Sequence, residues 1–274
     1  MKNFLKKYLP IPLGILLIVG SLYFRTQKAL AGPPAFIGTQ SAQCNASCTA
    51  TTGGLNTGSA DFCVAGVLEF VADPATGTMS DSAGNTWHHL TTVNNSTINN
   101  TEIVFWYTYN GGSAFITNTS DTFSFVGTSY PTMIVSCYSG VATATDPFDK
   151  ENGLITSGTT NYQTGSVTPT VNNELLVSLS GDFSGTNGNS YTIDSGFTTT
   201  GNAQNNNNLI VVHAYYTQPT AGAINPTWTA FAGNHEAIIA SFQPLPAASG
   251  PTVAPAKVSL PIGKESIMGK VSIP

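Results

Sequence analysis

Residues 102–109 read EIVFWYTY and end at the turn residues Asn110-Gly111-Gly112. A short run of β-branched and aromatic side chains, bounded by residues that tolerate positive φ, is typical of a strand that ends in a tight turn. The pattern recurs, and we expect strands at 61–71, 86–93, 102–109, 122–126, 132–139, 166–171, 174–180, 191–197, 209–216, 226–231 and 236–242. Beyond the first 31 residues no window places apolar residues at helical spacing, so the sequence predicts an all-β protein.

About eleven short strands without intervening helices are typical of an antiparallel β-sandwich, and we expect a jelly-roll-like one. The sandwich domain is predicted to span 32–246, beginning with an edge strand at 35–39. Residues 247–274 form a Pro/Ala/Ser-rich linker and a tail that contains KVSLP and KVSIP. The tail is either disordered or adds as an extended segment to a sheet edge, which would allow self-association.

The first 31 residues predict export. Lys2, Lys6 and Lys7 precede an apolar run at 8–24, and Ala29-Leu30-Ala31 follows. This order is that of a secretory signal peptide, 1–31, with no membrane attachment after cleavage. The alternative is an uncleaved anchor, but the run is shorter than the roughly 20 apolar residues a spanning helix needs. We therefore expect a secreted or cell-surface protein.

The charge of the body excludes one class of partner. Between Gly32 and Pro246 the chain carries thirteen carboxylates and one cation, Lys150, for a net charge of about −12. Binding to nucleic acid depends on Lys and Arg that displace counterions from phosphates. We therefore expect no nucleic-acid partner, and a surface kept soluble by Thr, Ser, Asn and Gly.

Four cysteines remain after export: Cys44, Cys48, Cys63 and Cys137. An even number of cysteines in an exported chain indicates disulfides. Three pairings are possible, and we favour Cys44 with Cys48 in a loop and Cys63 with Cys137 between two strands. A thiolate zinc site is the alternative, although the C-x3-C spacing lacks a second close Cys/His pair.

Several phrases resemble uncharacterised exported bacterial modules of the lectin-like β-sandwich type, found in surface and tail-type adhesins. They are DSAGNTW at 81–87, YSGV at 138–141 before Asp146-Pro147, NELLV at 173–177, and the closing Thr227-Trp228 and ASF at 240–242. The resemblance spans 61–242 and departs from the usual pattern at His88, His89 and Cys137. It implies a sandwich fold and, by analogy, adhesion or glycan binding.

Aromatic residues are the candidate glycan-binding groups, because a flat ring fits the C–H face of a sugar. We single out Tyr107, Tyr109, Tyr215, Tyr216 and Trp87. Each lies in a strand run, where aromatics also fill a sandwich core. The two tyrosine pairs are expected to be the more exposed.

Residues 146–153 read DPFDKENG, and oxygen ligands at short intervals beside a glycine are typical of calcium loops. Asp146, Asp149 and Glu151 are therefore candidate metal ligands, and calcium is the one cofactor we consider. Asp and Asn also simply favour turns. A transition-metal centre would need one of His88 or His89 together with His213 and His235.

No catalytic signature stands out. A glycosidase needs two carboxylates placed across a cleft, and the sequence shows no cluster of acids on one strand. No G-x-S-x-G motif is present for acyl transfer. The predicted function is a secreted or surface, non-catalytic module for adhesion or for binding a glycan or surface polymer. The alternatives are a structural subunit of an extracellular layer or filament and a glycan-active hydrolase.

Overall fold

The computed structural model describes residues 32–247 apart from 71, 92, 96–99 and 184–189. The predicted signal peptide and the tail from 248 onward lie outside the described residues. Within the described part, the regular elements are strands and one short 3-10 helix, η1 (Pro74–Thr76). The all-β prediction is confirmed. No helix in this part is long and apolar enough to cross a membrane.

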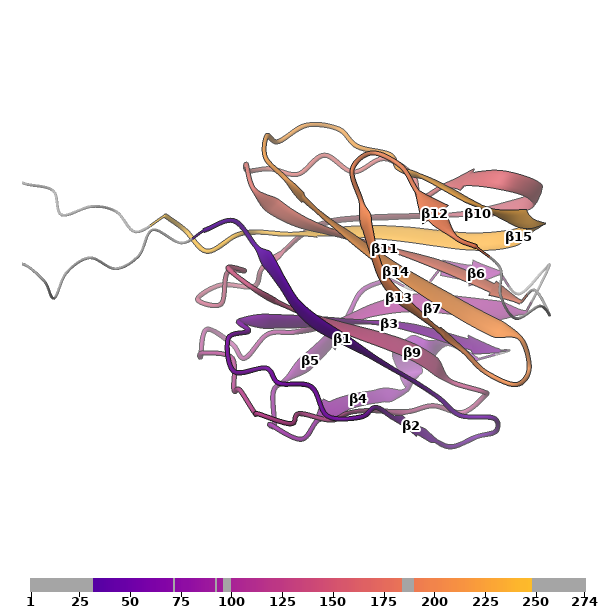
Figure 1. Ribbon diagram of the computed structural model, residues 1–274, viewed down its shortest axis with the longest axis horizontal. Helices are drawn as coiled ribbons and strands as arrows, with labels where there is room; N and C mark the ends of the chain where they lie inside the picture. The colour runs from indigo at the N-terminus through magenta and orange to yellow at the C-terminus, as the bar shows by residue number, and fades with distance from the viewer. Residues whose placement is uncertain (1–31, 71, 92, 96–99, 184–189, 248–274) are drawn as a thin grey trace, which may run out of the picture.

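Three antiparallel sheets lie one above another (Figure 1). The first contains β1 (Ala35–Gln43), β9 (Thr132–Ser139), β3 (Phe62–Phe70), β7 (Thr101–Thr108) and β5 (Trp87–His89) in that order, with β6 (Val93–Asn95) also paired to β7. The second contains β10 (Phe148–Gln163), β15 (Thr227–Phe242), β11 (Glu174–Phe183), β14 (Leu209–Gln218) and β13 (Thr198–Gln204), with β12 (Thr192–Ile193) paired to β15. The third contains β2 (Thr49–Thr51), β8 (Phe123–Val126) and β4 (Thr78–Asp81).

The first sheet is the middle layer, so its strands are buried on both faces. In β3, Phe62 and Val64 pack toward the second sheet, while Cys63 and Ala65 pack toward the third. This explains why β3 and β7 read as continuous apolar runs, since alternation requires one solvated face. Gly66 lets the two large sheets approach closely, because a Cβ there would lie 2.3 Å from Leu179 Cδ2.

The outer face of the second sheet is covered by its own long strands. Trp228 of β15 donates from Nε1 to Ser178 Oγ on β11 at 2.9 Å. The Tyr162 hydroxyl of β10 lies 2.6 Å from the Oγ of Ser180, which is also on β11. Because Ser178 and Ser180 share one face of β11, the β10–β15 ribbon must fold back over that face.

The structure corrects several strand boundaries. The predicted strand at 166–171 is reduced to one bridge, Val167 with Ile224, and that at 191–197 to Thr192–Ile193. The predicted strands at 226–231 and 236–242 are one strand, β15. β10 and β13 were not predicted, because these two edge strands are rich in polar residues, as edges exposed to water usually are.

Candidate functional site: a groove between two sheet edges

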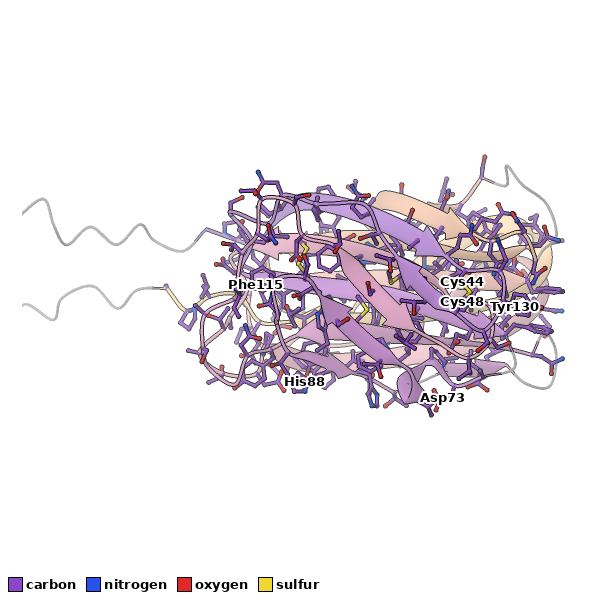
Figure 2. The ribbon with its side chains drawn as sticks, turned by 90° about the horizontal axis from the view of Figure 1, so that it is seen from below. Cys44, Cys48, Asp73, His88, Phe115 and Tyr130 are labelled. Carbon is purple, nitrogen blue, oxygen red and sulfur yellow. A yellow bond between two sulfur atoms is a disulfide. The ribbon has the colours of Figure 1, made fainter. Side chains whose placement is uncertain are left out.

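A groove runs along the side of the sandwich where the β5–β6 edge of the first sheet meets β10 of the second. Its deeper part, about 540 Å³ including space open to solvent, is lined by Thr91, Val93, Phe105, Glu151, Asn152, Gly153, Ile238 and Ile239. A shallower part shares Thr91 and Glu151 and adds Asp73, Ala75, His89, Leu90, Tyr107 and Phe148. We call the two parts together the edge groove. Asp73 and His88, the neighbour of His89, lie along the same side of the molecule in Figure 2.

The shape of the groove depends on one glycine, Gly153, and on hydrogen bonds between Glu151 and Thr91. A Cβ on Gly153 would lie 2.3 Å from Val93 Cγ2 and 2.8 Å from Ile238 Cγ2, so only glycine lets β10 come this close to β6. Glu151 reaches across and accepts hydrogen bonds from Thr91 N at 3.1 Å and Thr91 Oγ1 at 2.7 Å. The two sheet edges are thereby held at a fixed separation.

Tyr107 lines the groove, and its hydroxyl is hydrogen-bonded to Asp146. The hydroxyl is 3.1 Å from both carboxylate oxygens of Asp146. Burial, with the Asp146 charge, raises the pKa of Tyr107, so the phenol stays protonated and donates. The His88 ring lies 5.7 Å from the Tyr107 ring and 5.9 Å from that of Tyr109, and His88 Nε2 is 3.0 Å from the Tyr109 carbonyl oxygen.

The five aromatic candidates do not form one surface. Tyr107 is only 4 % exposed, so the expectation that it is exposed is wrong, and it contributes to the groove only from below. Trp87 is buried toward the third sheet, where its Nε1 donates to Asp81 Oδ2 at 2.9 Å. Tyr109 lines a separate small hollow beside Asp61.

Tyr215 and Tyr216 lie on β14, away from the edge groove, and point to opposite faces of the strand. Tyr215 stacks on Phe36 with ring centres 5.3 Å apart, between the two large sheets. Tyr216 packs on Phe197 at 5.6 Å on the outer face. Both are half-buried core residues in this structure.

The three candidate calcium ligands have separate partners. Because β10 begins at Phe148, much of the predicted acidic loop is strand, and this spreads the carboxylates apart. Asp146 accepts a hydrogen bond from the Tyr107 hydroxyl, and Glu151 accepts one from the Thr91 hydroxyl. Asp149 Oδ2 accepts a hydrogen bond from Thr170 N at 2.8 Å. Within the described ranges, no group of three or more His, Cys, Asp or Glu side chains could hold a metal ion.

The histidines also lie apart. His213 is fully buried, with Nδ1 2.8 Å from Thr200 Oγ1 and 3.1 Å from Ser136 Oγ, and burial lowers its pKa to about 3. His235 is buried on β15, with Nδ1 3.2 Å from Asp182 Oδ2. Neither meets His88 or His89, which belong to β5 of the first sheet. A centre built from these histidines is therefore not assembled.

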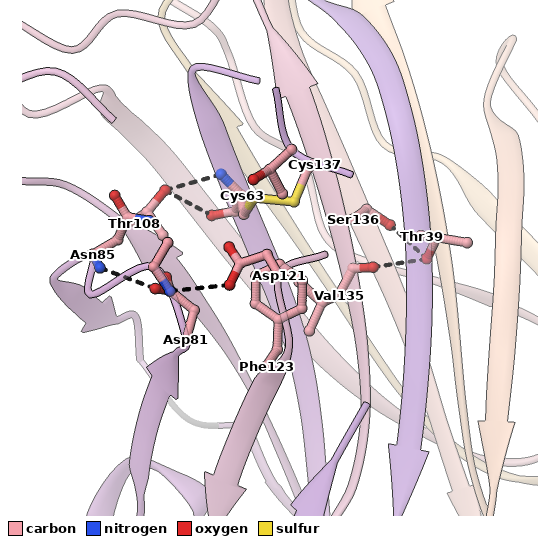
Figure 3. The surroundings of a disulfide bond; sticks show 12 residues. Thr39, Cys63, Asp81, Asn85, Thr108, Asp121, Phe123, Val135, Ser136 and Cys137 are labelled. Atoms are coloured by element: carbon pink, nitrogen blue, oxygen red, sulfur yellow. Dashed lines mark hydrogen bonds between the residues drawn. A yellow bond between two sulfur atoms is a disulfide. The ribbon is translucent and has the colours of Figure 1, made fainter. Parts of the chain in front are cut away.

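The favoured cysteine pairing is the one that the structure shows. Cys63 and Cys137 lie directly opposite each other on β3 and β9, and Cys44 pairs with Cys48 in the loop after β1. Figure 3 shows Thr108 beside the first bridge, where its Oγ1 accepts from Cys63 N at 2.9 Å and donates to Cys63 O at 3.2 Å. The cysteines are structural, and no zinc site forms from them.

Sequence reasoning missed a carboxyl pair. Glu69 and Glu102 are directly opposite in the β3–β7 register and are 1 % and 8 % exposed. Burial raises the pKa of both carboxyls, and Asp73 raises both further. The sequence signal for this pair was a glutamate in each of two apolar strand runs, Glu69 within 61–71 and Glu102 at the start of 102–109. Of these three carboxyls, Asp73 is the one among the lining residues of the edge groove.

The chain matches no protein-family model, no curated protein and no solved structure.

Proposed function

We propose that this protein is an exported, non-catalytic module that binds a glycan or another uncharged surface polymer in the edge groove. The observation that carries the proposal is the groove itself, a trough with an apolar floor between two polar rims. Val93, Phe105 and Ile238 form the floor of the deeper part, and Phe148 extends it as a half-buried ring. Apolar floors with a few convergent polar groups are typical of ligand sites.

The rims supply the groups that sugar hydroxyls need. Glu151 on β10 offers carboxylate oxygens, and the Thr91 hydroxyl on the opposite rim, which donates its own proton to Glu151, can accept a hydrogen bond. Asn152 donates one amide N–H to Ser166 O and keeps the other for a ligand. All three side chains are exposed, so a ligand can reach them without moving the sheets. With carboxylates along the groove and a body charge near −12, anionic polymers would be repelled. The ligand class that fits is therefore neutral.

Export is supported by two disulfides, since such bonds persist in oxidising surroundings outside the cytoplasm. The N-terminal pattern of a signal peptide points in the same direction. Adhesion is the role that we propose for this module by analogy with the lectin-like modules that its sequence resembles.

Titration of the full chain with a panel of neutral oligosaccharides, followed by amide chemical-shift mapping, tests the proposal. We expect shifts at Thr91, Val93 and residues 151–153, and a Kd weakened about tenfold when Thr91→Val and Glu151→Ala are combined, because the first change removes a rim hydroxyl and the second removes both rim carboxylate oxygens. Thr199→Val on β13, an exposed threonine at the other edge of the second sheet, is the matched control and should leave Kd unchanged. Absence of binding at millimolar ligand, or shifts confined to another surface, would contradict the proposal.

A specific observation favours a second role as a subunit of an extracellular assembly. β10 is the outer strand of the second sheet, and Leu154 and Ile155 on it are 44 % and 39 % exposed. An outer strand with exposed apolar residues is a surface on which another strand can add. Under this hypothesis the edge of β10 joins neighbouring copies.

A further inference from the structure

Two buried glutamates hold loops in the same way. Glu69, near the end of β3, is 1 % exposed, and its Oε1 accepts from the backbone N–H groups of residues 128–129 at 2.7 and 3.0 Å. Glu174, the first residue of β11, is fully buried, and its Oε1 accepts from those of residues 170–171, both at 2.9 Å. One oxygen of each carboxyl thus fastens a loop to the end of a strand.

Each of these glutamates also faces a second carboxyl. Glu69 lies directly opposite Glu102 in the β3–β7 register, and Asp73 adds a third carboxyl close to both. Glu174 faces Asp149 of β10, because Thr170 N lies 2.9 Å from Glu174 Oε1 and 2.8 Å from Asp149 Oδ2. Each pair brings together two carboxyl groups that would both be ionised at pH 7 if they were exposed to water.

The part of the chain between residues 32 and 246 offers little positive charge to offset them. Lys150 is the sole Lys or Arg between residues 32 and 246. Its Nζ lies 3.2 Å from Asp149 Oδ1, so this cation contacts the Asp149 carboxyl of the second pair. Among the described residues, the ionisable groups that act most strongly on Glu69 are Asp73 and Glu102, both of them acidic.

Two adjacent buried carboxyls cannot both ionise without a large penalty, and they titrate as a pair. Burial, followed by the neighbouring carboxyls, raises the pKa of Glu69 and of Glu174. We infer that each of the two loop-holding glutamates shares a proton with its neighbouring carboxyl, and that the fold is fitted to acidic surroundings in which each pair keeps that proton. As the surroundings become alkaline, each pair becomes doubly negative and the repulsion between two buried charges destabilises the fold, although the N–H groups of the loops favour the ionised carboxyl.

The direction in which pH changes the stability of the fold follows from the protonated form of each glutamate. A carboxyl whose pKa is higher in the folded protein than in the unfolded chain stabilises the fold below its ordinary pKa, near 4.3 for Glu, and this contribution is lost as pH rises through the folded pKa. His213 acts in the opposite direction, because its folded pKa of about 3 lies below its ordinary value of 6.5. Variants of the glutamates themselves are therefore needed to separate the two effects.

The experiment compares thermal unfolding of the full chain at pH 4.5 and pH 7.5 for the wild type, Glu69→Gln and Glu174→Gln. Glutamine keeps the oxygen that accepts from the loop and supplies an N–H in place of the proton. At pH 7.5 we expect each variant to melt about 3 °C or more above the wild type, and at pH 4.5 to melt at the same temperature. Asp194→Asn, which changes an exposed carboxyl outside the edge groove and keeps its accepting oxygen, is the matched control and should show no such difference.

Variants that melt below the wild type at pH 7.5, with an unchanged difference between the two pH values, would overturn the inference. A second measurement covers variants that fail to fold. A pH titration of the carboxyl carbon shifts of wild-type protein labelled with ¹³C-glutamate should show two glutamates that lose their protons at a higher pH than an ordinary glutamate. Titration of every glutamate in the ordinary range would also overturn the inference.

Discussion

At the scale of single residues, the close contacts between the layers depend on two glycines, which have no side chain beyond a hydrogen atom. Gly66 faces Leu179 across the two large sheets, and Gly153 faces Val93 across the edge groove. Both glycines lie in strands. A glycine inside a strand pattern predicts a close approach of some kind. The sequence does not reveal the partner, because that partner comes from a distant strand.

Gly66→Ala is expected to destabilise the protein by about 1–3 kcal/mol, since the new methyl group would overlap the buried Leu179 side chain. Gly222→Ala is the matched control, because the nearest atom to a Cβ there is Gln218 Nε2 at 3.8 Å. Urea unfolding at constant pH measures both free energies of unfolding. Equal stability of the two variants would show that the sheets separate easily at Gly66.

Two of the residues singled out from the sequence, Tyr107 and Glu151, line the edge groove. Tyr107, Tyr109, Asp146 and Glu151 were singled out for separate chemistries, and the structure brings Tyr107 and Glu151 to one groove, with Asp146 bonded to Tyr107. The remaining groove residues are ordinary apolar and polar side chains such as Val93 and Asn152. Nothing local distinguishes them, because their role arises from the meeting of two sheet edges.

At the scale of elements, sequence patterns predicted the buried strands and missed β10 and β13 at the edges of the second sheet and the short strands β2 and β4 of the third. The expected strand at 132–139 coincides with β9, which is buried along most of its length. β10, at the outer edge of the second sheet, reads FDKENGLITSGTTNYQ and was interpreted as a loop at its start. Apolar periodicity reports burial, so a strand that is largely exposed has no such signal.

The two disulfides are expected to differ in what they contribute to these elements. The Cys63–Cys137 bridge links β3 to β9 across 74 residues, for about 4–5 kcal/mol of stabilisation in the chain-entropy model, whereas Cys44–Cys48 spans four residues, for about 2 kcal/mol. Replacing each pair by alanines and measuring urea unfolding tests the order. A larger loss from the short bridge would contradict the entropic account.

At the scale of the whole molecule, the exposed edge of β10 makes assembly measurable. If copies join there, light scattering should show mass rising with concentration, and Leu154→Lys with Ile155→Lys should return the protein to a monomer, because edge lysines block strand addition. Ile116→Lys is the matched control, since Ile116 is a similarly exposed apolar residue, at 47 %, in a loop. A monomer at every concentration would argue against the assembly hypothesis.

The position of β15 in the second sheet decides when a newly made chain can finish folding. This strand is the last in the sequence, yet it lies between β10 and β11, which pair with it on either side. A chain that emerges N-terminus first holds β10 and β11 apart, with unsatisfied backbone groups on both, until residues 227–242 arrive. A ribosome or a secretion pore that stalls before this point would leave a product able to close its first sheet but unable to close its second.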